Sequence, residues 1–452
     1  MADKRPDPDL SVDARWVAPV DPFGIVLEWH SVIVSQGEII DVMPTAAAAE
    51  RYHVRQRIAL PQHLLIPGLV NLHTHAAMTL LRGLADDRLL MDWLRNHIWP
   101  AESRFASSEF VRDGTLLACA EMLRGGITCF NDMYFFPDAA AQAALVSGMR
   151  AALGMIAVEF RSAYASDADD YLHKGLALRD SLRGEPRLSF CLAPHAPYSV
   201  SDATFARIAT YAAELEVPVH IHLHETDEEI RESVTAYGIR PLQRLRKAGL
   251  LGPGLIAVHG VHLTTEEIEV LASHGCHVAH CPSSNLKLAS GIASVAALQR
   301  AGANVGLGTD GAASNNRLDI LAEMRLAALL AKTASGDATA ANAHAVLKMA
   351  TLNGARALAL DRLIGSLSPG KRADMVALDF AAPELAPCYD PLSHLIYAAG
   401  REHVAYVWVD GELLVENGAL TRFDLESVLA AAARWKDKIG SQDSGLVRAS
   451  LS

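Results

Sequence analysis

The stretch Leu69-Val70-Asn71-Leu72-His73-Thr74-His75 opens the pattern that decides the fold. It is a short apolar run that ends in polar side chains, and a segment compatible with a helix follows it. Seven similar runs come later in the chain, at 126–133, 150–158, 188–195, 217–224, 255–259, 276–281 and 305–309. Eight alternating strand and helix units of this kind predict an α/β fold, the (β/α)8 TIM barrel. We expect this barrel to occupy residues 67–372.

Segments with the composition of β-strands flank the barrel on both sides. They lie at 16–20, 31–34 and 38–42 before the barrel, and at 373–378 and 404–409 after it. Asp410-Gly411 has the composition of a turn. A barrel inserted between two β halves implies that these halves pair with each other. We therefore predict one small β-sandwich domain from residues 9–66 and 373–424, then an Ala-rich helix and a polar tail over 425–452.

The overall composition limits the classes of partner. The 452 residues carry a net charge of −12 and contain no basic run, which argues against nucleic-acid binding. No stretch of about 18 apolar residues predicts a membrane span, and the polar N-terminus lacks the apolar core of a signal peptide. The six cysteines are scattered, as is typical of reduced buried thiols. We expect a cytoplasmic enzyme with a small-molecule substrate, and a homo-oligomer on general grounds.

His73 and His75 are the first sign of a metal site. Alternate residues of a strand point to the same face, so both imidazoles should face the barrel interior. They also fall at the carboxyl end of the strand, where barrel active sites lie. Two core histidines with satisfied hydrogen bonds are the alternative. A catalytic metal ion needs about three protein ligands, so further strand ends should supply the others.

Three other strand ends carry possible ligands. The fifth strand contains His220, His222 and His224, and alternation cannot choose among them because all three share one face. The sixth strand ends in His259. The eighth ends in Asp310, and the glycines that flank this strand end allow a carboxylate to approach a ligand closely.

Four separated motifs carry a family resemblance. They are Ile66-Pro67-Gly68-Leu69-Val70-Asn71-Leu72-His73-Thr74-His75, His222-Leu223-His224-Glu225-Thr226, Val258-His259-Gly260-Val261-His262 and Leu307-Gly308-Thr309-Asp310-Gly311-Ala312-Ala313-Ser314-Asn315-Asn316. Together, and in this order, they resemble the amidohydrolase superfamily in its 5′-methylthioadenosine/S-adenosylhomocysteine deaminase branch. The resemblance extends from about residue 12 to residue 422.

The resemblance implies a site for a single divalent metal ion, zinc in the first place and iron as the alternative. Its ligands would be His73, His75, His222 and Asp310. Relatives that hold two ions bridge them with a carboxylated lysine on the fourth strand, where this chain has Ala193-Pro194-His195. By the same alignment His224 would be a rim residue and His220 a deeper core residue.

The resemblance also implies the reaction. The substrate would be 5′-methylthioadenosine, S-adenosylhomocysteine or adenosine, and the products an inosine derivative and ammonia. Glu225 would protonate ring N1, His259 would orient the attacking water, and Asp310 would take its proton. Taken singly, each has a structural alternative: Glu225 as a helix N-terminal carboxylate, His259 as a core residue and Asp310 as a helix cap.

The family pattern further implies a set of substrate contacts. Glu102 would accept hydrogen bonds from both ribose hydroxyls, and Trp93, His195 and Ser314 would contact the nucleoside. Core packing explains Trp93 equally well. Arg161 is the nearest candidate for a homocysteine carboxylate, with a solvated loop arginine as the alternative. Another amino-heterocycle, such as guanine or a triazine, and a non-catalytic binding role are the competing hypotheses.

Overall fold

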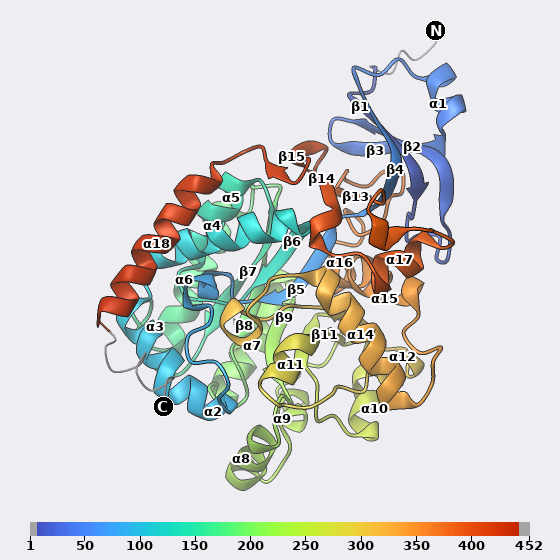
Figure 1. Cartoon of the computed structure of the whole chain (residues 1–452). Helices are drawn as coiled ribbons and strands as arrows, with labels where there is room; N and C mark the ends of the chain where they lie inside the picture. The colour runs from blue at the N-terminus through green and yellow to red at the C-terminus, as the bar shows by residue number, and fades with distance from the viewer. Residues whose placement is uncertain (1–6, 443–452) are drawn as a thin grey trace.

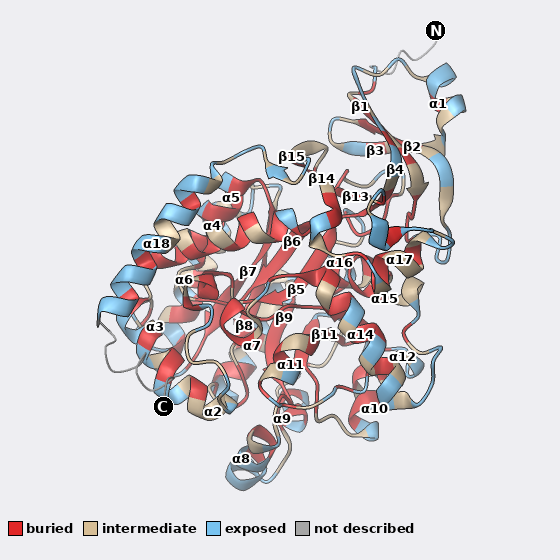
Figure 2. Ribbon diagram, in the orientation of Figure 1, coloured by how far each residue is buried: buried red, intermediate tan, exposed pale blue. Residues whose placement is uncertain are grey.

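Eight parallel strands form the barrel predicted from the alternating pattern. The computed structural model describes residues 7–442 and places these strands around one axis (Figure 1). They are β5 (Leu69–Thr74), β6 (Ile127–Asp132), β7 (Arg150–Ala157), β8 (Leu188–Pro194), β9 (Val219–Leu223), β10 (Leu255–His259), β11 (His277–His280) and β12 (Asn304–Leu307). Each strand pairs with the next along the chain. Nearly all of their residues are buried, which explains why the runs are continuously apolar (Figure 2).

Backbone hydrogen bonds close the barrel between its last strand and its first. β12 and β5 share no regular ladder, but the N–H groups of Thr309 and Asp310 both donate to the carbonyl oxygen of His73, over 3.1 and 3.0 Å. Asn71 adds a side-chain link, accepting from the Thr309 N–H over 3.0 Å. This closure brings Asp310 next to His73, although 237 residues separate them in sequence.

Helices surround the barrel (Figure 1). Those that begin after Ser107, Asp167, Ser201 and Thr226 are capped by these side chains, which accept a backbone N–H of the first turn. The helices are α1 (Thr45–Arg51), α2 (Leu90–Trp93), α3 (Trp99–Phe105), α4 (Ser108–Arg124), α5 (Pro137–Ser147), α6 (Ala168–Leu182), α7 (Asp202–Leu215), α8 (Asp227–Tyr237), α9 (Pro241–Lys247), α10 (Thr265–Ser273), α11 (Pro282–Lys287), α12 (Val295–Arg300), α13 (Ala312–Asn315), α14 (Ile320–Ser335), α15 (Ala343–Met349), α16 (Leu352–Ala357), α17 (Pro391–Tyr397) and α18 (Leu425–Gln442).

Both halves of the chain build the second sheet, as the flanking β segments predict. Its strand order is β16-β15-β14-β13-β4-β1-β2-β3. The strands are β1 (Leu10–Val17), β2 (Leu27–Ser35), β3 (Glu38–Pro44), β4 (Gln56–Pro67), β13 (Met375–Asp379), β14 (Val404–Val409), β15 (Glu412–Glu416) and β16 (Ala419–Leu420). The two halves meet where β4 and β13 pair antiparallel, with Met375 opposite Pro67. β4 and the short helix α1 are elements that the sequence patterns did not predict.

Buried ion pairs fasten this sheet to the barrel. Arg150 and Arg187 lie at the amino ends of β7 and β8. Arg150 is 3% exposed and binds Asp374 through two nitrogens, at 3.1 and 3.2 Å, and Asp410 at 2.7 Å. Arg187 donates to Asp410 over 2.8 Å. The sheet therefore sits at the amino ends of the strands, and the carboxyl ends stay available for a site.

The C-terminal helix lies along the outside of the barrel beside α4 (Figure 1). Trp435 packs edge-on against Phe110 and donates from its indole nitrogen to Asp113 over 3.1 Å. The helix predicted after Asp424 is thus confirmed, while the predicted polar tail lies outside the described residues. Among residues 7–442, no helix combines the length and the apolar character that a bilayer crossing needs. All six cysteines are free thiols.

Candidate metal centre and active site

Four side chains converge at the carboxyl ends of three strands. His73 is in β5 and His75 directly follows it, His222 is in β9, and Asp310 comes after β12. One ligand atom from each lies within 4.8 Å of all the others. The structure thus brings together the four predicted ligands, and His220 and His224 are not members of the cluster.

The spacing of these atoms suits a small divalent ion. His73 Nε2 lies 3.2 Å from both Asp310 Oδ1 and His222 Nε2, and His75 Nε2 lies 3.3 Å from Asp310 Oδ1. Ligands held tetrahedrally at about 2.0–2.1 Å from an ion are roughly 3.3 Å apart. The residues therefore fit a metal ion of this size.

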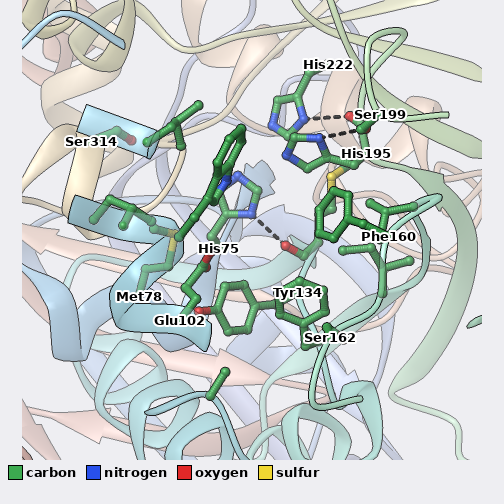
Figure 3. A pocket seen from close by; sticks show the side chains of 18 of the residues that line it. His75, Met78, Glu102, Tyr134, Phe160, Ser162, His195, Ser199, His222 and Ser314 are labelled. Carbon is green, nitrogen blue, oxygen red and sulfur yellow. Dashed lines mark hydrogen bonds between the residues drawn. The ribbon is translucent and has the colours of Figure 1, made fainter. Parts of the chain in front are cut away.

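Hydrogen bonds on the far side of each imidazole fix its orientation. His75 Nδ1 donates to the carbonyl oxygen of Met133 over 2.6 Å, and His222 Nδ1 donates to that of His195 over 2.7 Å (Figure 3). His73 Nδ1 lies 2.9 Å from Nε2 of the fully buried His220. Because the Nδ1 atoms are engaged in this way, the Nε2 lone pairs face the common centre, as metal ligation requires. The core position predicted for His220 is confirmed.

Burial favours neutral imidazoles at two of these positions. It lowers the pKa of His73 to about 4 and the pKa of His222 well below its ordinary value. Neutral imidazole is the form that binds metal, so both rings are ready to act as ligands near pH 7.

The backbone around Asp310 is shaped for close approach. Asp310 has φ 62°, a left-handed conformation that costs about 1–2 kcal/mol for a residue with a side chain. A Cβ atom on Gly308 would lie 2.9 Å from both Cβ and N of His73, so only glycine fits there. Asp310 Oδ2 points away from the histidines and accepts hydrogen bonds from Ser284 Oγ at 2.6 Å and Ser314 Oγ at 2.7 Å.

Glu225 and His259 lie side by side next to the ligand cluster. Both are buried, and Glu225 Oε2 is 3.7 Å from His259 Nε2. Burial raises the pKa of Glu225, with Asp310 adding to the rise and His259 opposing it. His259 has φ 71° and its Nδ1 lies 2.8 Å from Asn285 Oδ1. This arrangement places a carboxyl group of raised pKa beside an oriented imidazole, as a general acid requires.

A carboxylate that the sequence motifs did not single out holds the end of β9. Glu229, in the first turn of α8, accepts the backbone N–H of His224 at 3.0 Å and that of Glu225 at 2.8 Å. His224 has φ 55° and its side chain turns away from the ligands. Its Nε2 accepts the Leu242 N–H over 3.1 Å, and the residue is 0% exposed. The rim position predicted for His224 was therefore wrong, because the left-handed turn ends the strand alternation.

A cavity of about 840 Å³ opens beside the cluster and contains every predicted substrate contact. Trp93, Glu102, Arg161, His195 and Ser314 all line it, together with Glu225. Figure 3 shows several of these side chains around the cavity. The Ser314 hydroxyl donates to Asp310, and the Trp93 indole nitrogen donates to the carbonyl oxygen of Leu84 over 3.4 Å. Both side chains thus have structural partners as well as a face toward the cavity.

Glu102 and His195 both line the cavity with polar side chains. In Figure 3 the Glu102 carboxyl group and the Tyr134 hydroxyl point toward each other. Burial raises the pKa of Glu102 to about 7, against the opposing effects of Tyr134 and His75. Burial lowers the pKa of His195 to about 3, so its ring is neutral, and its Nδ1 lies 3.1 Å from Ser199 Oγ. His195 Nε2 is left free to meet a ligand.

Comparison with known proteins places the chain among hydrolases of this architecture. Residues 64–414 match the amidohydrolase family. A protein of Teredinibacter turnerae named 5-methylthioadenosine/S-adenosylhomocysteine deaminase is 51% identical over 96% of this chain and 98% of its own. A protein of the same name from Saccharophagus degradans is 46% identical over 98% and 99%. The crystal structure of a zinc-bound adenosine deaminase from Xanthomonas campestris superposes with a TM-score of 0.95, at 49% identity over 97% of this chain and 100% of that one.

Proposed function

Because this chain belongs to the amidohydrolase family, we propose that it is a metal-dependent deaminase of adenosine-type nucleosides. Its substrates would be 5′-methylthioadenosine, S-adenosylhomocysteine or adenosine, each converted to the inosine derivative and ammonia. One observation carries the proposal. A metal-ligand cluster, the buried carboxyl group of Glu225 with its raised pKa, and Glu102 as an acceptor suited to a ribose diol all face one cavity.

His73, His75, His222 and Asp310 would hold one divalent ion, for which we infer zinc over iron. The zinc-bound relative of known structure and the donor set of three imidazoles and one carboxylate favour zinc. Such an ion acts as a Lewis acid and makes hydroxide available at neutral pH for attack on C6 of the purine.

The side chains around the ion would donate and accept the protons of the reaction. Glu225, whose pKa burial raises, would donate a proton to ring N1 as C6 is attacked, and its carboxylate would then be ready to take a proton again. His259 Nε2, fixed by the bond between Nδ1 and Asn285, would accept a hydrogen bond from the attacking water. Asp310 would take the proton of that water and pass it to the departing amino group, which leaves as ammonia.

The cavity walls favour an uncharged 5′ substituent. Tyr134, Phe135, Phe136 and Tyr164 line it, with the rings of Phe136 and Tyr164 5.3 Å apart. A thioether packs well against aromatic rings. Arg161 is the one lysine or arginine among the lining residues and makes no ion pair with any described residue. We infer that it is the partner for a homocysteine carboxylate, from an exposed position where such a pair contributes about 0–1 kcal/mol.

A panel of substrates tests the proposal directly. Zinc-loaded protein is mixed with adenosine, 5′-methylthioadenosine, S-adenosylhomocysteine, guanine and cytosine, and ammonia release is measured. We expect turnover of the adenosines, with methylthioadenosine best. Turnover of guanine alone would transfer the assignment to another amino-heterocycle. No turnover of any adenosine would refute the proposed function.

The predicted domain boundaries, cytoplasmic location and homo-oligomeric state stay predictions.

A further inference from the structure

The short helix α11 contacts the active site from a strand that supplies no metal ligand. β11 contributes no member of the ligand cluster, yet the helix that follows it places Ser284 and Asn285 against two groups from other strands. Both residues are at most 1% exposed. No motif singled out either residue.

Ser284 reaches the carboxylate that follows β12. Its hydroxyl donates to Asp310 Oδ2 over 2.6 Å, while Oδ1 of the same carboxylate faces His73 and His75. Ser314, which follows Asp310 in the chain, donates to the same Oδ2. Two donors on one oxygen prevent the carboxylate from rotating and leave only Oδ1 for an ion.

Asn285 reaches the imidazole that ends β10. Its Oδ1 lies 2.8 Å from His259 Nδ1, which places the proton on Nδ1 and the lone pair on Nε2, toward Glu225. The Asn285 Nδ2 group makes no hydrogen bond to any described residue. The amide oxygen of Asn285 is therefore the atom that accepts the hydrogen bond from His259.

A buried carboxylate on α14 holds this helix in place. Glu323 is 1% exposed and accepts the backbone N–H of Ser283 at 3.0 Å and the Asn315 side-chain amide at 2.8 Å. Asn315 belongs to α13, which also carries Ser314. One carboxylate thus links the two short helices whose serines bind Asp310.

We propose that Ser284 and Asn285 are positioning residues, with Ser284 setting Asp310 for metal binding and Asn285 setting the tautomer of His259 for the reaction. The part that concerns Asn285 rests on the deaminase function proposed above. The part that concerns Ser284 does not, because metal affinity can be measured without any substrate.

The first experiment compares Ser284→Ala with its neighbour Ser283→Ala, by competition with a zinc chelator on the full chain. The Ser283 side chain contacts Glu323 and no member of the ligand cluster. This variant keeps both serine bonds to Asp310 and should bind zinc like the parent. We expect a 10–100-fold lower zinc affinity for Ser284→Ala, the range typical of outer partners of metal ligands. Equal affinities of the two variants would overturn the assignment of Ser284, whether or not the protein is a deaminase.

The second experiment compares Asn285→Leu with Asn285→Asp. Leucine has a similar size but no acceptor, and we expect kcat for methylthioadenosine to fall 10–100-fold with KM and zinc affinity unchanged. Aspartate keeps the acceptor and loses no bond at Nδ2, so kcat should recover to within about fivefold of the parent. Equal loss in both variants, or loss of zinc along with kcat in the leucine variant, would overturn the positioning role.

Discussion

Replacing Glu102 with glutamine would test how the cavity recognises a nucleoside. The proposed role is acceptance of hydrogen bonds from both ribose hydroxyls by one carboxylate. Glutamine has nearly the same shape, but it offers one oxygen acceptor and an amide that only donates. The substitution therefore removes one acceptor and the negative charge while leaving the cavity volume unchanged.

The expected loss follows from the kind of bond removed. A hydrogen bond to a charged group contributes about 1.5–3 kcal/mol, and a neutral one about 1 kcal/mol. Losing one charged bond and weakening the other should cost roughly 2–4 kcal/mol, which corresponds to about a 30–1,000-fold lower kcat/KM. The assay should run near pH 8, because the Glu102 pKa of about 7 leaves the carboxylate mostly ionised there.

A substrate without the diol supplies the internal control. kcat/KM is measured for adenosine and for 2′,3′-dideoxyadenosine, in the parent protein and in the Glu102→Gln variant. kcat/KM for adenosine should fall by the full factor of about 30–1,000, while kcat/KM for the dideoxy compound should change less than about threefold. Glu109→Gln makes the same chemical change at an exposed position of α4 and should alter neither value. Equal losses for both compounds, or no loss for adenosine, would refute the role of Glu102.

Three further predictions concern the same cavity. As pH falls through about 7, Glu102 takes up a proton and loses its acceptor character, so KM for adenosine should rise while KM for the dideoxy compound stays level; parallel curves would contradict this. Glu225→Gln should lower kcat by about 10²–10⁴-fold with zinc content unchanged, and a fully active variant would exclude Glu225 as the proton donor. Arg161→Ala should lower kcat/KM for S-adenosylhomocysteine by up to about fivefold and spare methylthioadenosine, whereas an equal effect on both would remove Arg161 from the 5′ site.

The barrel was predictable because its strands are buried on both faces. Each leaves a continuous apolar run in the sequence, as in Leu255–His259, and such runs need no partner to be recognised. β4 was not predicted, because its sequence does not form a continuous strand pattern. Its sequence contains Pro61, which interrupts any strand pattern, and the structure accommodates it where the register between β1 and β4 shifts.

The cluster of His73, His75, His222 and Asp310 was predictable from spacing and resemblance, but the groups around it were not. Alternation along β9 could not choose between His222 and His224, since the deciding feature is the positive φ at His224. Ser284 and Asn285, both on α11, each meet a partner 26 residues away, at or after the end of another strand. Such contacts follow from the closure of the barrel and leave no periodic trace in the sequence.

The pairing of β4 with β13 also means that β4 is synthesised long before its partner strand. When β4 leaves the ribosome, one of its edges has no neighbour, because its partner β13 begins only at Met375. At about 5–20 residues per second, roughly 15–60 s pass before that partner is made. During this interval the nascent chain exposes an unpaired strand edge that another chain could occupy. The joint that completes the native sheet is thus also a point at which newly made chains are exposed to mispairing.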